Sequence, residues 1–133
     1  MSDIEVVDVE TITPKSTRAK ARHHTFTIDK PPTSGGHDKG PMASEYFLAS
    51  LASCHITTAH KVAEKRQQKI EHIQIRGALH LNGDLIEKIE LDIKVKGKIS
   101  PEELDTVFRL TERICTISRA TSVPITRNIS TVA

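Results

Sequence analysis

Apolar and polar residues alternate along four segments of this chain, as they do in strands that bury one face. These segments are residues 4–13, 70–81, 85–95 and 124–132. Asn82-Gly83-Asp84 separates the two middle segments, and because Asn-Gly is the strongest short hairpin signal, they are predicted to form an antiparallel hairpin. A further strand is predicted at residues 24–28.

Two other segments have the features of helices. Residues 44–68 contain neither Gly nor Pro, start at Ser44, a favourable N-cap residue, and end among Lys and Arg side chains that the helix dipole favours. At 1.5 Å per residue this helix would be roughly 35 Å long, comparable with the width of a whole domain of this size. Ser100-Pro101-Glu102-Glu103 has the pattern of a helix start and predicts a second helix that ends near Cys115.

The predicted order of elements, β-β-α-β-β-α-β, is that of an α+β fold. We expect a single domain over residues 1–133, because this length suits one compact core and the sequence contains no repeat. Residues 29–42, before the long helix, are rich in Gly and Pro. They predict a long loop of the kind that is often functional or mobile.

Composition narrows the possible partners. The 19 Lys and Arg nearly balance the 17 Asp and Glu, so the net charge of +2 provides no strong field for nucleic acid or an anionic membrane. Aromatic residues make up only 3% of the chain, so the core must rely on aliphatic side chains, and a second subunit could complete it. Neither a leader-like N-terminus nor a membrane-length apolar run is evident, so we expect a cytoplasmic protein.

Cys54 and Cys115 are too few for a disulfide scaffold, and a cytoplasmic location would keep them reduced. Cys54 ends a stretch of apolar and small residues, 46–54, which predicts that this half of the long helix is buried. Such a position suits an inert core thiol, and it equally suits a thiolate held beside a cation away from bulk water. Residue types alone leave both interpretations open.

Two motifs resemble the signatures of the OsmC/Ohr family of cysteine-based hydroperoxide reductases. Residues 35–54, GGHDKGPMASEYFLASLASC, are similar to its Gly-rich loop and the helix that ends at the peroxidatic cysteine. Residues 115–121, CTISRAT, are similar to the motif of the resolving cysteine. Both motifs occur in the family's order with the predicted hairpin between them, and the resemblance covers nearly the whole chain except the first dozen residues.

The resemblance implies an OsmC-like fold in which a long central helix packs between sheets, usually as an intertwined homodimer with active sites at the subunit interface. It also implies a thiol-dependent peroxidase that reduces organic or lipid hydroperoxides. Cys54 would be oxidised to sulfenic acid, and Cys115 would condense with it to a disulfide. A dithiol reductant would restore both thiols, so no cofactor or metal is expected.

In the peroxide reductases of this family, an Arg from the N-terminal region and a Glu at the start of the long helix surround the reactive thiol. Arg22 and Arg18 are the candidates for the first role here, and Arg22 is favoured because it is nearer the strand that leads to the Gly-rich loop. Glu45 is the candidate acid, although it falls one position later than the family's Glu, where Ser44 stands. The helix dipole alone also favours an acid in the first turn.

Thr116 is a second departure, because it stands where the family commonly has proline. The shifted Glu45 motivates a second hypothesis. The chain could be a non-catalytic OsmC-like module that binds a small apolar or thiol-containing ligand at the dimer interface.

The seven histidines do not form a metal-binding motif. His23 and His24 are adjacent, His55 and His60 are poorly aligned on a helix, and no zinc-type spacing with the cysteines occurs. His55, next to Cys54, could tune the thiol or be a hydrogen-bonded core histidine.

Overall fold

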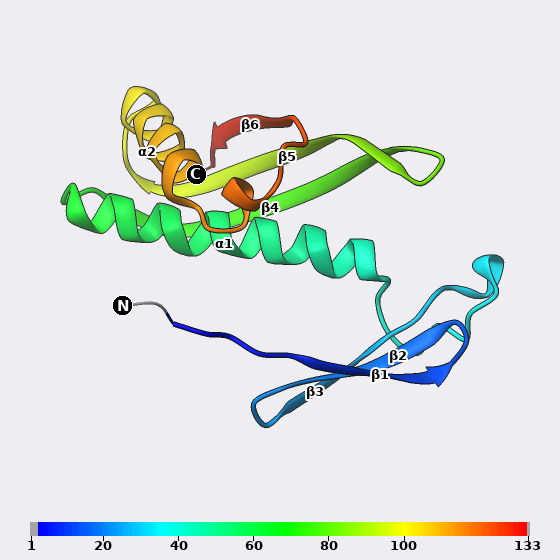
Figure 1. Ribbon diagram of the computed structural model, residues 1–133. Helices are drawn as coiled ribbons and strands as arrows, with labels where there is room; N and C mark the ends of the chain where they lie inside the picture. Colours follow the sequence, from blue (N-terminus) through cyan, green and yellow to red (C-terminus); the bar gives the residue numbers. More distant parts are fainter. Residues whose placement is uncertain (1–2, 133) are drawn as a thin grey trace. The chain divides into compact units, whose positions relative to one another are not determined.

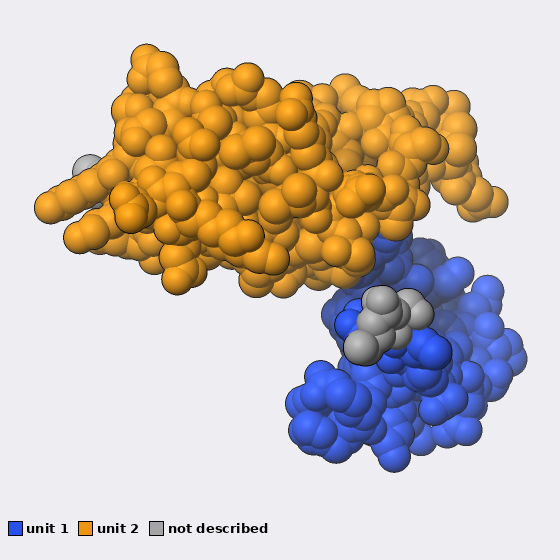
Figure 2. Space-filling model, turned by 60° about the vertical axis from the view of Figure 1, so that its left-hand side comes forward, with its two compact units in different colours: residues 1–47 blue, residues 48–133 orange. Residues whose placement is uncertain are grey.

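The computed structural model describes residues 3–132 and consists of two compact units, Met1–Phe47 and Leu48–Ala133 (Figure 1, Figure 2). Each unit contains one three-stranded sheet. The single domain predicted over residues 1–133 stays a prediction.

The first unit is an antiparallel meander in the order β1-β2-β3. Its strands are β1 (Asp8–Thr13), β2 (Ser16–Ala21) and β3 (His24–Ile28). The sequence predicted the outer two, although β1 begins at Asp8 and not at residue 4. It missed β2, whose Ser-Thr-Arg-Ala-Lys-Ala sequence lacks large apolar side chains. This segment is a strand because both neighbours supply ladder hydrogen bonds, which outweighs its weak intrinsic preference.

The predicted long loop at 29–42 is held by one buried carboxylate. The Asp29 side chain is 2% exposed and accepts hydrogen bonds from the backbone N–H groups of Lys30, His37 and Lys39 at 2.7, 3.3 and 3.1 Å. Within the loop, a Cβ at Gly36 would collide with the Lys30 carbonyl. Glycine is therefore required where the two arms of the loop approach most closely.

The long helix α1 (Ala43–Lys65) starts and stops differently from the prediction. Ser44 is not its N-cap, because the first turn begins one residue earlier. The Glu45 carboxylate instead accepts a hydrogen bond from the backbone N–H of Met42 at 2.8 Å, as in one half of a capping box.

The C-terminus of α1 is a Schellman motif, so the helix ends before residue 68. Gln67 has a left-handed φ of 57°, and its N–H bonds to the Glu64 carbonyl at 3.0 Å. The N–H of Gln68 bonds to the Ala63 carbonyl at 2.9 Å. These are the two hydrogen bonds of that motif, with Gln in the position usually taken by Gly.

The second unit confirms the predicted hairpin, second helix and last strand. Its elements are β4 (Lys69–Asn82), β5 (Leu85–Lys98), α2 (Pro101–Ile114), the 3-10 turn η2 (Ser118–Ala120) and β6 (Ile125–Thr131). β4 and β5 are antiparallel, and β6 lies parallel to β5 on its other side. The predicted helix start is confirmed at α2, where Ser100 and Glu103 form a capping box with hydrogen bonds of 3.1 and 3.0 Å.

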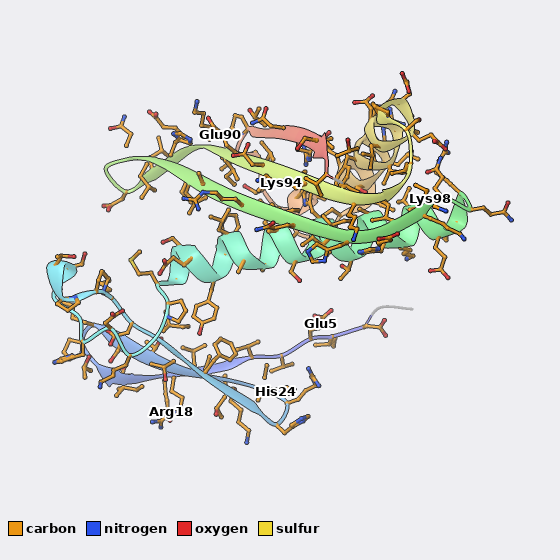
Figure 3. The ribbon with its side chains drawn as sticks, turned by 180° about the vertical axis from the view of Figure 1, so that it is seen from behind. Glu5, Arg18, His24, Glu90, Lys94 and Lys98 are labelled. Carbon is orange, nitrogen blue, oxygen red and sulfur yellow. The ribbon has the colours of Figure 1, made fainter. Side chains whose placement is uncertain are left out.

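One face of β5 is buried and the other is exposed. Ile89, Leu91, Ile93 and Val95 are at most 1% exposed, whereas Glu90, Lys94 and Lys98 alternate with them and lie on the outer face (Figure 3). The core beneath this sheet is completed by apolar side chains of the two helices. They are Leu51, Ala59, Val62 and Ala63 of α1 and Leu104, Val107 and Phe108 of α2.

None of the helices within residues 3–132 combines the length and the apolar character needed to cross a bilayer.

Candidate active site

The two cysteines come together between the helices of the second unit. Cys54 lies on α1 and is half-buried, while Cys115 is the C-cap residue of α2 and is fully buried. Both thiols are free, and each lies close enough to the other to influence its pKa. The sequence separation left their distance open, and it is the packing of α1 and α2 in one core that brings them into contact.

The surroundings of Cys54 favour its thiolate. Burial alone would raise its pKa, but hydrogen bonds from the Ile117 backbone, the Cys115 thiol, the Thr58 hydroxyl and the Thr116 backbone outweigh it, and the pKa falls below its usual value. The Thr58 Oγ1 lies 3.9 Å from Sγ. A half-exposed thiol with a lowered pKa has the character of a nucleophile.

The surroundings of Cys115 favour its neutral thiol. Burial is the main cause that raises its pKa, and the hydrogen bond with Cys54 raises it further, against lowering hydrogen bonds from the Ser118 backbone and side chain. The two neighbouring sulfurs therefore have opposite shifts. One is prepared to be a thiolate, and the other stays a thiol that can donate to it.

A third buried polar group touches this pair. His55 is 0% exposed, and its Nδ1 lies 3.1 Å from the Leu51 carbonyl and 3.5 Å from Sγ of Cys115. On the other side of the ring, Nε2 accepts hydrogen bonds from Nε and Nη2 of Arg127 on β6, at 3.0 and 2.7 Å. Arg127 also forms a 3.0 Å ion pair with Glu112 of α2.

The ring of His55 is held neutral. Burial lowers its pKa most, and the positive charge of Arg127 lowers it further. A histidine of this kind is both a core residue and a neighbour of the reactive sulfurs.

The other predicted site residues belong to the first unit. Arg18 lies on β2, 4.0 Å from the Glu10 carboxylate, and both side chains are largely exposed. Arg22 occupies the two-residue turn between β2 and β3 with a left-handed φ of 57°. Glu45 caps α1 through Met42. The structure thus unites Cys54 with Cys115, and the roles of Arg18, Arg22 and Glu45 stay predictions.

Arg127 is the site residue that the sequence reasoning missed. It shares the less exposed face of β6 with Ile125 and Ile129, and its side chain is only 8% exposed. A charge at a position where the strand pattern calls for an apolar residue requires a buried partner. That signal was available, although it did not identify His55 as the partner.

No group of three or more His, Cys, Asp or Glu side chains suited to a metal ion occurs in the described part of the chain, residues 3–132.

Comparison with known proteins extends this description. The sequence model of the OsmC-like protein family matches residues 36–130. An OsmC-like protein from Mycoplasma pneumoniae is 17% identical over 100% of both chains, with a TM-score of 0.89. A hypothetical protein from Aquifex aeolicus is 18% identical over 98% of both chains, with a TM-score of 0.84.

The organic hydroperoxide resistance protein OhrB of Bacillus subtilis is 19% identical over 96% of this chain and 98% of its own, with a TM-score of 0.71. A comparison with functionally curated proteins found no match. The predicted OsmC-like fold is confirmed, with β2 added to the predicted order of elements.

Proposed function

Because this chain belongs to the OsmC-like protein family, we propose that it is a thiol-dependent peroxidase that reduces organic or lipid hydroperoxides. The observation that carries the proposal is the contact between two thiols with opposite pKa shifts, lowered for Cys54 and raised for Cys115. The lowered pKa suits a nucleophile, and the raised pKa suits a resolving thiol that stays protonated.

In the proposed cycle the Cys54 thiolate attacks the outer oxygen of the peroxide and breaks the O–O bond. The substrate leaves as an alcohol after taking a proton, and Cys54 becomes a sulfenic acid. The Cys115 sulfur then attacks the Cys54 sulfur, its proton leaves with the sulfenic hydroxyl as water, and a disulfide forms. A dithiol reductant reduces that disulfide and is itself oxidised to a disulfide. A cytoplasmic location would supply such reductants.

On the family resemblance, we propose Arg22 as the cation of the site and Glu45 as its acid. Arg22 is the preferred cation, because Arg18 already faces Glu10. A guanidinium near Cys54 would stabilise the thiolate and the negative charge that develops on the leaving oxygen. Glu45 uses one carboxylate oxygen for the N–H of Met42, and its second oxygen would orient the arginine.

We also propose that the protein is a homodimer. The N-terminal segment leaves apolar side chains in solvent, with Ile4 86%, Val6 64% and Val9 57% exposed. Neighbouring exposed apolar side chains in a single chain are typical of an interaction surface. A second copy of the chain is the occupant that the family resemblance supports.

The peroxidase proposal is tested by mixing the reduced protein with stoichiometric cumene hydroperoxide and determining free thiols and intact mass. The wild type is expected to lose both thiols and form a Cys54–Cys115 disulfide. Cys115→Ser is expected to stop at sulfenic acid on Cys54, and Cys54→Ser to leave the peroxide unconsumed. A wild type that keeps both thiols would overturn the proposal.

The second candidate is a non-catalytic module that binds a small apolar or thiol-containing ligand. It is favoured by the capping role of Glu45, which accounts for that residue without any chemistry. Ligand binding that persists in a Cys54→Ser, Cys115→Ser double variant would support this function. Binding that depends wholly on the thiols would count against it.

A further inference from the structure

Beside Cys115 lies a histidine whose tautomer is set by a residue far away in the sequence, with Nδ1 3.5 Å from Sγ. Nε2 of His55 accepts hydrogen bonds from two nitrogens of Arg127, at 3.0 and 2.7 Å. An imidazole nitrogen that accepts hydrogen bonds carries no proton, so the proton of the neutral ring is on Nδ1. Nδ1–H is thus the group that faces the Leu51 carbonyl and Sγ of Cys115.

We propose that His55 is a catalytic residue of this site, which donates a hydrogen bond from Nδ1 to the Cys115 sulfur whenever that sulfur becomes negatively charged. Arg127 is the corresponding positioning residue, because it acts through Nε2 of the ring. The proposal rests on the assignment of Cys115 as the resolving cysteine in the proposed function.

The geometry explains why this hydrogen bond would strengthen during the reaction. In the dithiol state Nδ1–H is shared, with the Leu51 carbonyl at 3.1 Å as its nearer acceptor and Cys115 Sγ at 3.5 Å. A neutral thiol is a weak acceptor, whereas a thiolate is a strong one, and hydrogen bonds to charged groups are about twice as strong as neutral ones. Little movement of the ring is required, so the donor is already in place.

Cys115 becomes negative in both halves of the cycle. In the oxidative half, its S–H proton passes to the departing hydroxyl of the Cys54 sulfenic acid while the S–S bond forms. In the reductive half, an external thiolate attacks Cys54, which is the more exposed sulfur. The S–S bond breaks, Cys115 leaves as a thiolate, and it then takes up a proton from solvent.

A buried sulfur needs this help more than an exposed one. Cys115 is 0% exposed, so solvent cannot stabilise its thiolate. The nearby Ser118 hydroxyl donates to the backbone carbonyls of Cys115 and Glu112, at 3.3 and 3.4 Å. The Glu112 carboxylate, on a side chain that is 55% exposed, forms a 3.0 Å ion pair with Nη1 of Arg127. This ion pair orients the guanidinium, which in turn orients the His55 ring. The contacts from Glu112 through Arg127 to His55 thereby orient an N–H donor toward a sulfur that is buried in the core.

The first test does not require peroxidase activity. The Cys54–Cys115 disulfide is formed with diamide, and thiol–disulfide exchange is followed in both directions with reduced and oxidised dithiothreitol. In His55→Gln, the side-chain oxygen can replace Nε2 as the acceptor for Arg127, but the donor at the Nδ1 position is lost. Both exchange rates should fall about tenfold to a hundredfold, the range for one hydrogen bond to a charged group.

The midpoint potential of the disulfide should stay nearly unchanged in His55→Gln, because the hydrogen bond to the neutral Cys115 thiol is weak and the strong one to its thiolate exists only during exchange. His55→Asn places an amide N–H near the Nδ1 position and should recover most of the rate. His60→Gln is the matched control on the same helix and should leave both rates unaltered. Unaltered exchange rates in His55→Gln would overturn the proposal. A fall in one direction only, which changes the midpoint potential, would also overturn it and show a structural role in one of the two stable states.

The second test uses the wild type and does not depend on any variant folding. Nitrogen NMR of His55 should show a protonated Nδ1 and an unprotonated Nε2, and Arg127→Met should release this preference. An unprotonated Nδ1 in the wild type would overturn the proposal. If the wild type failed to consume peroxide but showed the expected exchange rates and tautomer, the proposed function would fall while the role of His55 toward Cys115 would stand.

Discussion

The Glu45 carboxylate accepts a hydrogen bond from the backbone N–H of Met42 at 2.8 Å, so the acid proposed for the active site is also the N-terminal cap of α1. Two substitutions separate these roles. Glu45→Gln keeps a capping oxygen and should leave the free energy of unfolding nearly unchanged, while the loss of charge should slow peroxide reduction about tenfold. Glu45→Ala should in addition lower the free energy of unfolding by about 1 kcal/mol.

Urea denaturation and peroxide consumption measured on the same preparations check both expectations. If Glu45→Gln retained the full rate of peroxide reduction, Glu45 would be a cap alone.

The C-terminus of the same helix offers a stabilising substitution. Gln67 has a φ of 57° in the Schellman motif, where a side chain costs about 1 kcal/mol that glycine avoids. Gln67→Gly should therefore raise the free energy of unfolding by roughly 0.5–1 kcal/mol, allowing for the greater freedom of glycine in the unfolded chain. Gln67→Ala retains the Cβ and should give no such gain in urea denaturation.

How much could be predicted differs between the two units. The β4–β5 hairpin and α2 follow from local signals, Asn82-Gly83 and the Ser100–Glu103 capping box, and both are confirmed. β2 could not be predicted in this way, because its small and polar residues form a strand only through pairing with β1 and β3. Local pattern specifies elements whose stabilising contacts are local.

The candidate site shows the same division. Cys54 and Cys115 were identified from motifs, but the His55–Arg127 hydrogen bonds join residues 72 positions apart. The alternating pattern of β6 marks Arg127 as an inward charge without indicating which buried group meets it. Only the packed structure supplies that pairing.

The pH at which Cys54 reacts as a thiolate should depend on Cys115. Burial raises the pKa of Cys54, and hydrogen bonds lower it. The largest lowering effect comes from the Ile117 backbone, and the next comes from the Cys115 thiol. Cys115→Ala should therefore move the pH profile of Cys54 alkylation by iodoacetamide to higher pH. Cys115→Ser retains a hydroxyl donor and should shift the profile less, and an unshifted profile in both variants would remove Cys115 from this role.

The loop at 29–42 should depend on the ionisation of Asp29. Hydrogen bonds from the backbone of Lys30 and Lys39 lower the pKa of this carboxyl against the effect of burial, with a further contribution from His37. A group whose pKa is lower in the folded state contributes stability above its unfolded pKa of about 3.9 and loses it as the pH falls through the folded value. Asp29→Asn should thus lower the urea midpoint at neutral pH, and the difference from wild type should shrink in acid.

Hydrogen exchange locates this effect. The amides of Lys30, His37 and Lys39 donate to Asp29 and should exchange faster in Asp29→Asn, whereas amides in β5 should keep their protection. A uniform loss of protection across the chain would mean global destabilisation and not a local role of Asp29.

The exposed apolar N-terminal segment should determine the oligomeric state. Val9, 57% exposed on β1, would be covered in the proposed homodimer, so Val9→Lys would bury a charge there and should shift the protein toward monomers. Light scattering should give about twice the 14.7 kDa chain mass for wild type and a lower mass for the variant. Val9→Thr keeps the β-branched shape and the strand preference, and should remain dimeric. A monomeric wild type at high protein concentration would leave these side chains exposed in solution and would contradict the homodimer.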